Sequence, residues 1–558
     1  MAGRLRTAAW VLLVILYVAA FPYHPGLRSP NELVRLHQTR ALVEYGSIDI
    51  NRALMDYGRV GDMSVKDGKY YPSKAPLLSF AATPIYYVLR ILGGSHLYAV
   101  KEIPLVFWTR LFLTILPTLL MLWVLRRYLA TYLPGPIADA LVLTYALGTL
   151  AFSYSLLLMS HQPTAVLLFG AFYALWRCGR GDWRERGYLI AGAFAGATIL
   201  AEYTGALAVV VLALYAALTF LIHHSVPLVS RLRGLARAAG LATLGALPFI
   251  LALMAYHQAA FGHPLESGYK YLADAGYQHW HLGGFLGIRY PDPVAFVHSF
   301  FSPLRGHFTL SPFLLLALPG TALLFSATGK KGGSYQSLLA PEAKVSDGRF
   351  HPADRATFYF VVALFAAYAY FTSSFEHTSW GWTSGPRHLT GLVPFLLLPI
   401  GLVLVRARAA KSVLRFTAGG LAGLCAASIL VTGAVSFVNY IPDNVSEPLF
   451  GLALPLFRTG HLSPSVFWLL GLGNPASGAL LVTILLLLAT ICVWFIIKPA
   501  PEEPARLALG NAAVALAVVI SFVALHGALA RGDEADLGAE GFLRSVWLAP
   551  PGTPPSAP

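Results

Sequence analysis

The chain has 558 residues, of which 56% are hydrophobic and only 12% are charged, and its mean hydropathy is +0.63. Soluble globular proteins carry about 25% charged residues, so the composition excludes that class and indicates a polytopic membrane protein. The net charge of +14 does not indicate nucleic-acid binding, because excess Lys and Arg in a membrane protein first reflects topology and contact with anionic lipid.

The first apolar run, Trp10 to Phe21, follows a short basic N-terminus. This arrangement resembles a secretory signal peptide, but no convincing small-x-small cleavage site follows it. We therefore expect an uncleaved first transmembrane span. The three cysteines, Cys178, Cys425 and Cys492, lie in or beside apolar runs and predict no disulfide framework.

A spanning helix needs about 20 mainly apolar residues, and thirteen segments approach this length. The predicted fold class is thus an all-α polytopic membrane protein with about thirteen transmembrane helices and extracytoplasmic loops that carry interfacial helices. The predicted spans are 5–22, 104–125, 137–157, 161–177, 188–202, 204–224, 237–257, 310–328, 356–373, 389–405, 414–437, 477–497 and 508–530.

The apolar run 75–93 decides the sidedness of everything after it. Pro76, Pro84 and Arg90 interrupt it, so it can span the membrane or lie along its surface. If it does not span, most Lys and Arg of the short connections fall on the side of the N-terminus; if it does, this asymmetry is lost. The positive-inside rule therefore predicts a multi-pass protein of the inner cell membrane with a cytoplasmic N-terminus, and it places 75–93 on the outer interface. Five loops then face the extracytoplasmic side: 23–103, 158–162, 258–309, 374–388 and 438–476.

The segment "SPNELVRLHQTRALVEYGSIDI", residues 29–50, is unusually charged for a stretch that directly follows a span. Glu32, Arg35 and Thr39 share one face of a predicted helix. Either this helix lies on the membrane with its polar face in water, or the face binds a charged lipid. Lys74, just before the run 75–93, is open to the same two interpretations.

Several of these stretches resemble one family. "NELVRLHQTRALVEYGSIDI" followed by "YYPSKAPLLSF" is similar to the first outer loop of the GT-C superfamily of membrane glycosyltransferases, in particular the lipid A aminoarabinose transferases and the protein O-mannosyltransferases. Those enzymes begin this loop with Asp-Glu on a short helix, and a Lys-Pro-Pro-Leu motif follows in the aminoarabinose branch. Here Asn31 replaces the aspartate, Glu32 matches the glutamate, and Lys74 begins the related "KAPL". Further likeness in "FGHPLESGY", "SFFSPLRGHFTLSPF" and "GPRHL" extends the resemblance over about residues 1–400.

The resemblance implies that a sugar moves, with inversion, from a polyprenyl-phosphate donor to an extracytoplasmic acceptor. Because Asn31 departs from the usual base, three residues remain candidates for the catalytic role: Glu32, Asp49, and His161 in the loop where relatives carry a second acidic residue. Basic residues at outer span borders suit phosphate binding. The predicted donor-phosphate ligands are Lys74, Arg387 and Arg305, and the predicted sugar or lipid contacts are Asn31, Arg35, Tyr71, Trp382 and His388.

No cofactor is expected. A polyprenyl-phosphate donor needs no nucleotide, and the sequence contains no phosphate loop or dinucleotide motif. Some members of the superfamily use a divalent ion, but Asn31 in place of an acid weakens such a site, so we predict metal independence. The predicted partners are the donor lipid, membrane lipids and an unspecified acceptor, with no nucleic acid.

Two alternatives come from other functional classes. A lipid or polysaccharide transporter is the second interpretation. Charged residues inside spans mark transport paths, but here they are sparse, namely Arg110 and Glu202, and the polar residues are concentrated in the outer loops, which favours an enzyme. A catalytically inactive scaffold of envelope assembly is the third. We divide the chain into a GT-C-like core, residues 1–437, and a C-terminal transmembrane region, 438–558, that ends in a disordered tail.

Overall fold

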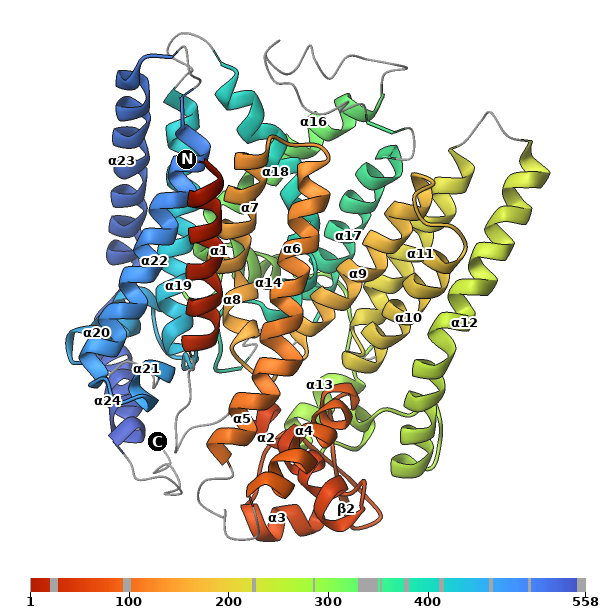
Figure 1. Ribbon diagram of the computed structural model, residues 1–558. Coiled ribbons are helices and arrows are strands. Elements are labelled where there is room, and N and C mark those ends of the chain that lie inside the picture. Colours follow the sequence, from red (N-terminus) through yellow and green to blue (C-terminus); the bar gives the residue numbers. More distant parts are fainter. Residues whose placement is uncertain are drawn as a thin grey trace.

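The computed structural model describes residues 2–20, 29–93, 102–222, 227–284, 287–329, 350–351, 354–375, 381–410, 416–460, 465–499 and 503–548 (Figure 1). The predicted tail "APPGTPPSAP" lies outside this part of the chain. So does most of the polar stretch 329–355, which the sequence predicts to be flexible.

Long helices form a bundle, and each of the thirteen predicted spans overlaps one of them. The multi-pass membrane architecture is therefore confirmed, although the number thirteen stays a prediction: within the described residues, six helices are long and apolar enough to cross a membrane by length and composition. The bundle helices are α1 (Ala2–Ala19), α6 (Leu116–Ala130), α7 (Gly135–Leu147), α9 (His161–Gly179), α10 (Arg186–Ala201), α11 (Gly205–Leu221), α12 (Leu228–Phe261), α16 (Ala317–Gly329), α17 (Asp354–Ser374), α18 (Val393–Arg408), α19 (Thr417–Val438), α22 (Asn474–Ile497) and α23 (Ala505–Leu529).

Shorter elements connect the bundle helices. The helices are α2 (Pro30–Arg40), α3 (Asn51–Tyr57), α4 (Leu77–Gly93), α5 (Glu102–Arg110), α8 (Leu150–Ser155), α13 (Ala275–Leu282), α14 (Pro293–Phe301), α15 (His307–Leu310), α20 (Leu454–Arg458), α21 (Val466–Leu469) and α24 (Glu534–Leu548). Two strands, β1 (Met63–Lys66) and β2 (Lys69–Pro72), form an antiparallel hairpin. Single turns of 3-10 helix cover Gly268–Tyr271, Pro312–Leu316 and Arg387–Gly391, and π-helical turns cover Ala41–Tyr45, Leu111–Ile115 and Leu449–Ala453.

The first loop lies at one end of the bundle. Helix α1 runs from the N-terminus to that end, where α2, α3, α4 and α13 gather, and α5 and α6 lead back across (Figure 1). Helix α4 therefore does not cross the bundle, as predicted for 75–93. Its outer side exposes Tyr87, Ile91 and Leu92, an apolar surface that suits the membrane interface.

The predicted span 137–157 is not one continuous helix. It breaks at Gly148, where a Cβ atom would lie 2.8 Å from the backbone nitrogen of Ile429 on α19. Thr149 then caps α8 by accepting a hydrogen bond from the Ala151 amide. Close approach of two backbones thus interrupts a run whose apolar composition predicts an unbroken helix.

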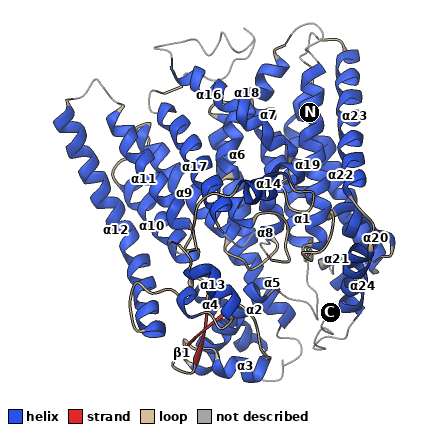
Figure 2. Cartoon of the chain, turned by 180° about the vertical axis from the view of Figure 1, so that it is seen from behind, coloured by secondary structure: helices blue, strands red, loops and turns tan. Residues whose placement is uncertain are grey.

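The all-α prediction also misses the hairpin, which lies beside α3 and α4 at the same end of the molecule (Figure 2). Its two turn residues, Asp67 and Gly68, both have positive φ, which is the conformation of a type I′ turn. An Asp-Gly pair between two short β-prone runs is a strong hairpin signal, so the sequence does contain this feature.

The predicted division at residue 437 stays a prediction. In the structure, α22 from the second part packs against α1, α7 and α19 of the first part.

Candidate active site

The polar face of α2 is buried. Its side chains are covered by other elements, so the interpretation of a helix whose polar face lies in water is wrong. Arg35 is completely inaccessible and Glu32 is only 3% exposed. The buried residues of α2 are Asn31, Glu32, Val34, Arg35, Leu36, His37, Gln38, Thr39 and Arg40.

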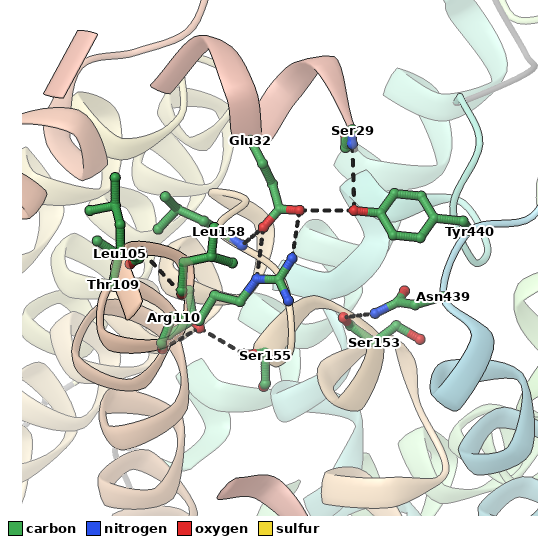
Figure 3. A network of polar contacts seen from close by, with 12 residues as sticks. Ser29, Glu32, Leu105, Thr109, Arg110, Ser153, Ser155, Leu158, Asn439 and Tyr440 are labelled. Carbon is green, nitrogen blue, oxygen red and sulfur yellow. Dashed lines mark hydrogen bonds and ion pairs between the residues drawn. The ribbon is translucent and has the colours of Figure 1, made fainter. Parts of the chain in front are cut away.

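Glu32 is the centre of a buried ion pair with Arg110 at the end of α5 (Figure 3). Arg110 Nε lies 3.0 Å from Oε1 and its Nη2 lies 2.9 Å from Oε2, a bidentate arrangement. The Leu158 amide donates to Oε1, and the Tyr440 hydroxyl donates to Oε2 over 3.1 Å. One carboxylate thus joins α2, α5, the turn before α9 and the segment after α19.

This geometry gives Glu32 a positioning role. Both of its oxygens already accept two hydrogen bonds, from Arg110, Leu158 and Tyr440, so the carboxylate is fully engaged by protein groups. The prediction that Glu32 is the base stays a prediction, but the contacts favour another residue.

Arg35 is the central donor of a second cluster of polar side chains, which adjoins the first. Its Nε donates to Asn31 Oδ1 over 3.2 Å, so Asn31 orients this guanidinium. The other nitrogens donate to the Ala75 carbonyl over 2.9 Å and to Ser160 Oγ over 3.1 Å. Ser160 in turn donates to the buried carboxylate of Glu202. Arg35 therefore links the first loop to the start of α9 and the end of α10.

The hairpin places Asp62 against Lys74. The register pairs Met63 with Pro72, so Asp62 lies opposite Ser73, whose amide donates to its carbonyl, and Lys74 is the next residue along the chain. Lys74 Nζ is 3.1 Å from Asp62 Oδ1, with 10% of the lysine side chain and 33% of the aspartate side chain exposed. Burial acts to raise the pKa of Asp62, but Lys74, Arg387 and Arg35 overcome it and hold the pKa below its ordinary value.

Arg387 and His161 complete the cluster. Arg387 belongs to the 3-10 turn before α18, and its Nε is buried without a hydrogen-bond partner among the described residues. His161 begins α9, is 4% exposed, and has an Nε2 that lacks a partner in the same part of the chain. Its ring lies 5.2 Å from that of His388. The charges of Arg387, Arg35 and Lys74 all act on His161.

Four other predicted site residues make contacts of their own. Asp49 accepts from the Ser47 hydroxyl and the Asn51 amide, so it shapes the local turn before α3. Tyr71 packs edge-on against Phe261 in an apolar cluster. Trp382 packs edge-on against Phe542 of α24. Arg305 is 1% exposed and forms an ion pair with Asp443.

The arrangement suits an anionic ligand. Arg35 from α2, Lys74 from the end of the hairpin and Arg387 from the turn before α18 all act on Asp62, and Asp62 forms an ion pair with Lys74. Such positive charge binds phosphate oxygens well. Among the described residues, no three His, Cys, Asp or Glu side chains converge as metal ligands, and metal independence stays a prediction.

Sequence reasoning missed Asp62, and it did not connect Glu32 with Arg110 and Tyr440. The Asp-Gly turn is a signal that could have placed Asp62 near Lys74, because a two-residue hairpin pairs Asp62 with Ser73, the neighbour of Lys74. The partners of Glu32 leave no local signal, since they are 78 and 408 residues away in the chain.

No family model and no curated protein sequence matches the chain. Among solved structures, it is similar to ArnT from Cupriavidus metallidurans in the apo state, with a TM-score of 0.46 and 15% identity over 93% of this chain and 78% of that chain. The same ArnT bound to undecaprenyl phosphate gives a TM-score of 0.42 and 13% identity over 90% and 81% of the two chains.

Proposed function

We propose that the chain is a membrane glycosyltransferase of the GT-C type that moves a sugar from a polyprenyl-phosphate donor to an extracytoplasmic acceptor. One observation carries this proposal: Lys74, Arg35 and Arg387 converge at the end of the bundle that holds the first loop, and Arg387 Nε is buried there without a partner among the described residues. Buried polar atoms are normally hydrogen-bonded, so this geometry suits a ligand that supplies acceptor oxygens.

The charge balance fits the leaving group of such a reaction. A polyprenyl-phosphate sugar is a phosphodiester with one negative charge, and loss of the sugar leaves a phosphate monoester with two. Positive groups that are fixed in advance stabilise a charge that grows in the transition state. Lys74 and Arg387 would bind the phosphate oxygens directly. Arg35, whose guanidinium is held by Asn31 and Ser160, would add positive charge close to them. Inversion follows from direct displacement at the anomeric carbon.

Glu32 supports this site indirectly in the proposal. The Glu32–Arg110 pair ties α2 to α5, and α2 carries Arg35 on the same face three residues later. Glu32 and Arg35 are therefore both held in fixed positions relative to the hairpin. Asp49, His161 and Glu32 remain the sequence-based candidates for proton transfer, and Arg305, Tyr71, Trp382 and His388 remain candidates for lipid or sugar contact.

The transporter alternative gains no support from the two charges inside predicted spans. Arg110 pairs with Glu32, and Glu202 accepts from Ser160 beside Arg35. Both charges therefore belong to the network at the first-loop end and do not mark a separate path through the bundle.

The test is sugar transfer by the full chain in lipid nanodiscs. Radiolabelled polyprenyl-phosphate sugars would be offered as donors, and total envelope lipid and polysaccharide as acceptors. We expect turnover by the wild type and a loss of at least about 100-fold in Lys74→Gln and in Arg387→Gln. Lys69→Gln is the matched control, because Lys69 lies on the same hairpin with an exposed side chain.

A folded wild type that transfers no sugar from any donor contradicts the proposal and favours the transporter or the scaffold. Turnover that Lys74→Gln and Arg387→Gln leave unchanged keeps a transferase but removes this cluster from its site.

A further inference from the structure

We propose that Asp62 is the catalytic base of this site, and that the donor phosphate frees it by taking over its ion-pair partner Lys74. The acceptor nucleophile is then a hydroxyl group, since a phosphate acceptor attacks through an oxygen that is already deprotonated and needs no base. This inference rests on the proposed function and assigns a residue and a substrate class within it.

The position of Asp62 follows from local geometry. The type I′ turn at Asp67 and Gly68 fixes the register of the hairpin, and the Ser73 amide donates to the Asp62 carbonyl over 2.9 Å. Asp62 itself has a φ of 58°, a left-handed conformation that is uncommon for residues other than Gly, Asn and Asp.

The carboxylate of Asp62 is more accessible to a ligand than the carboxylates of Glu32 and Glu202. Oδ1 contacts Lys74, while Oδ2 has no hydrogen-bond partner among the described residues, and 33% of the side chain is exposed. Glu32 has both oxygens occupied by Arg110, Leu158 and Tyr440. Glu202 is 8% exposed and already accepts from a serine.

The electrostatics explain why donor binding would activate this group. Asp62 is faced by Lys74 from the hairpin, Arg387 from the turn before α18 and Arg35 from α2, and the phenols of Tyr269 and Tyr277 also interact with it. In the ligand-free protein the cations keep the pKa of Asp62 low despite its partial burial, so it is a weak base. A bound phosphate neutralises these cations, and the pKa of the carboxyl then rises.

The acceptor oxygen attacks the anomeric carbon while its proton moves to Asp62 Oδ2. The bond between that carbon and the phosphate oxygen breaks, and its electron pair stays on the phosphate, whose charge changes from −1 to −2. Asp62, now neutral, returns the proton to water through its exposed side.

The experiment compares Asp62→Asn with Asp67→Asn. Asparagine tolerates a positive φ, so both variants keep the backbone of the hairpin. Asp67 has a φ of 51°, is exposed and lies at the turn, which makes it a matched control. Binding of a sugar-free polyprenyl phosphate in nanodiscs is measured first, and sugar transfer second.

We expect Asp62→Asn to bind polyprenyl phosphate about three- to tenfold more tightly than the wild type, because Lys74 no longer has a competing partner. Its kcat should fall by about 100- to 10,000-fold, the usual contribution of general base catalysis. In the wild type, the acid limb of kcat, which reports the donor complex, should lie at higher pH than that of kcat/KM, which reports the free enzyme. Asp67→Asn should match the wild type in every measurement.

Three results overturn the proposal while leaving the transferase intact. They are a kcat of Asp62→Asn within tenfold of the wild type, weaker binding of polyprenyl phosphate by that variant, and coincident acid limbs of kcat and kcat/KM. Weaker binding would mark Asp62 as a residue that only positions Lys74. A wild type without any sugar transfer refutes the proposed function and this assignment together.

Discussion

Variants of the Glu32–Arg110 ion pair can show whether Glu32 positions the site or acts as its base. The two side chains are 4% and 3% exposed, so removing either charge leaves the other buried without compensation. Loss of one partner from a buried ion pair costs about 3–5 kcal/mol. We therefore expect Glu32→Gln to lower the free energy of unfolding by about 3 kcal/mol or more, and its turnover to fall as the site loosens.

The double variant Glu32→Gln, Arg110→Gln is the decisive one. Two neutral amides can hydrogen-bond to each other and leave no buried charge, so we expect its stability to return to within about 2 kcal/mol of the wild type. Unfolding is followed by denaturant titration in mixed micelles, and turnover by the nanodisc assay. Glu185→Gln, which breaks the exposed pair with Arg237, is the control and should cost less than about 1 kcal/mol.

Recovered stability together with recovered turnover supports positioning, because no carboxylate then remains at residue 32. A double variant as stable as the wild type but without turnover would refute this reasoning and restore Glu32 as the base.

Three further results are expected. Gly192→Ala should destabilise the protein by about 1–3 kcal/mol in the same titration, because a Cβ atom would lie 1.9 Å from the Ala242 carbonyl oxygen where α10 packs on α12; an unchanged midpoint would contradict that close packing. Tyr440→Phe should cost about 1.5 kcal/mol, since the hydroxyl donates to Glu32, and a loss of turnover much larger than the loss of stability would point to a direct role for the phenol. Asp62 has a lowered pKa in the folded state, so its ion pair stabilises the protein above about pH 4 and this contribution disappears as the pH falls through the lowered pKa. The stability difference between the wild type and Asp62→Asn should therefore shrink below about pH 4, and a constant difference would contradict the pairing.

Some site residues could be predicted from the sequence, because the evidence for them is their own charge and the apolar segment beside them. Lys74 and Arg387 stand next to apolar segments, on the side that the distribution of Lys and Arg predicts to be extracytoplasmic, and both lie in the cluster at the first-loop end. The distribution of Lys and Arg predicts that the run 75–93 does not cross the membrane, and α4 stays at one end of the bundle. That this end is the outer one stays a prediction.

The partners of these residues could not be identified in the same way. A helical pattern shows that Glu32 and Arg35 share a face, but it cannot tell whether that face meets water, lipid or protein. The structure buries it, and it gives Glu32 an arginine 78 residues away and a tyrosine 408 residues away. Asp49 is a plausible base from its type and position, yet its contacts lie within its own turn.

The sequence by itself determined the membrane-embedded class, the approximate spans and the concentration of charge in the first loop. These properties follow from the transfer of apolar side chains out of water, which depends on composition over about 20 residues and on no distant partner. The tertiary structure alone decided which charges neutralise one another and which stay available to a ligand. The energy of an ion pair depends on distance, burial and competing hydrogen bonds, and these quantities exist only once segments far apart in the chain, such as the hairpin and the turn before α18, have come together.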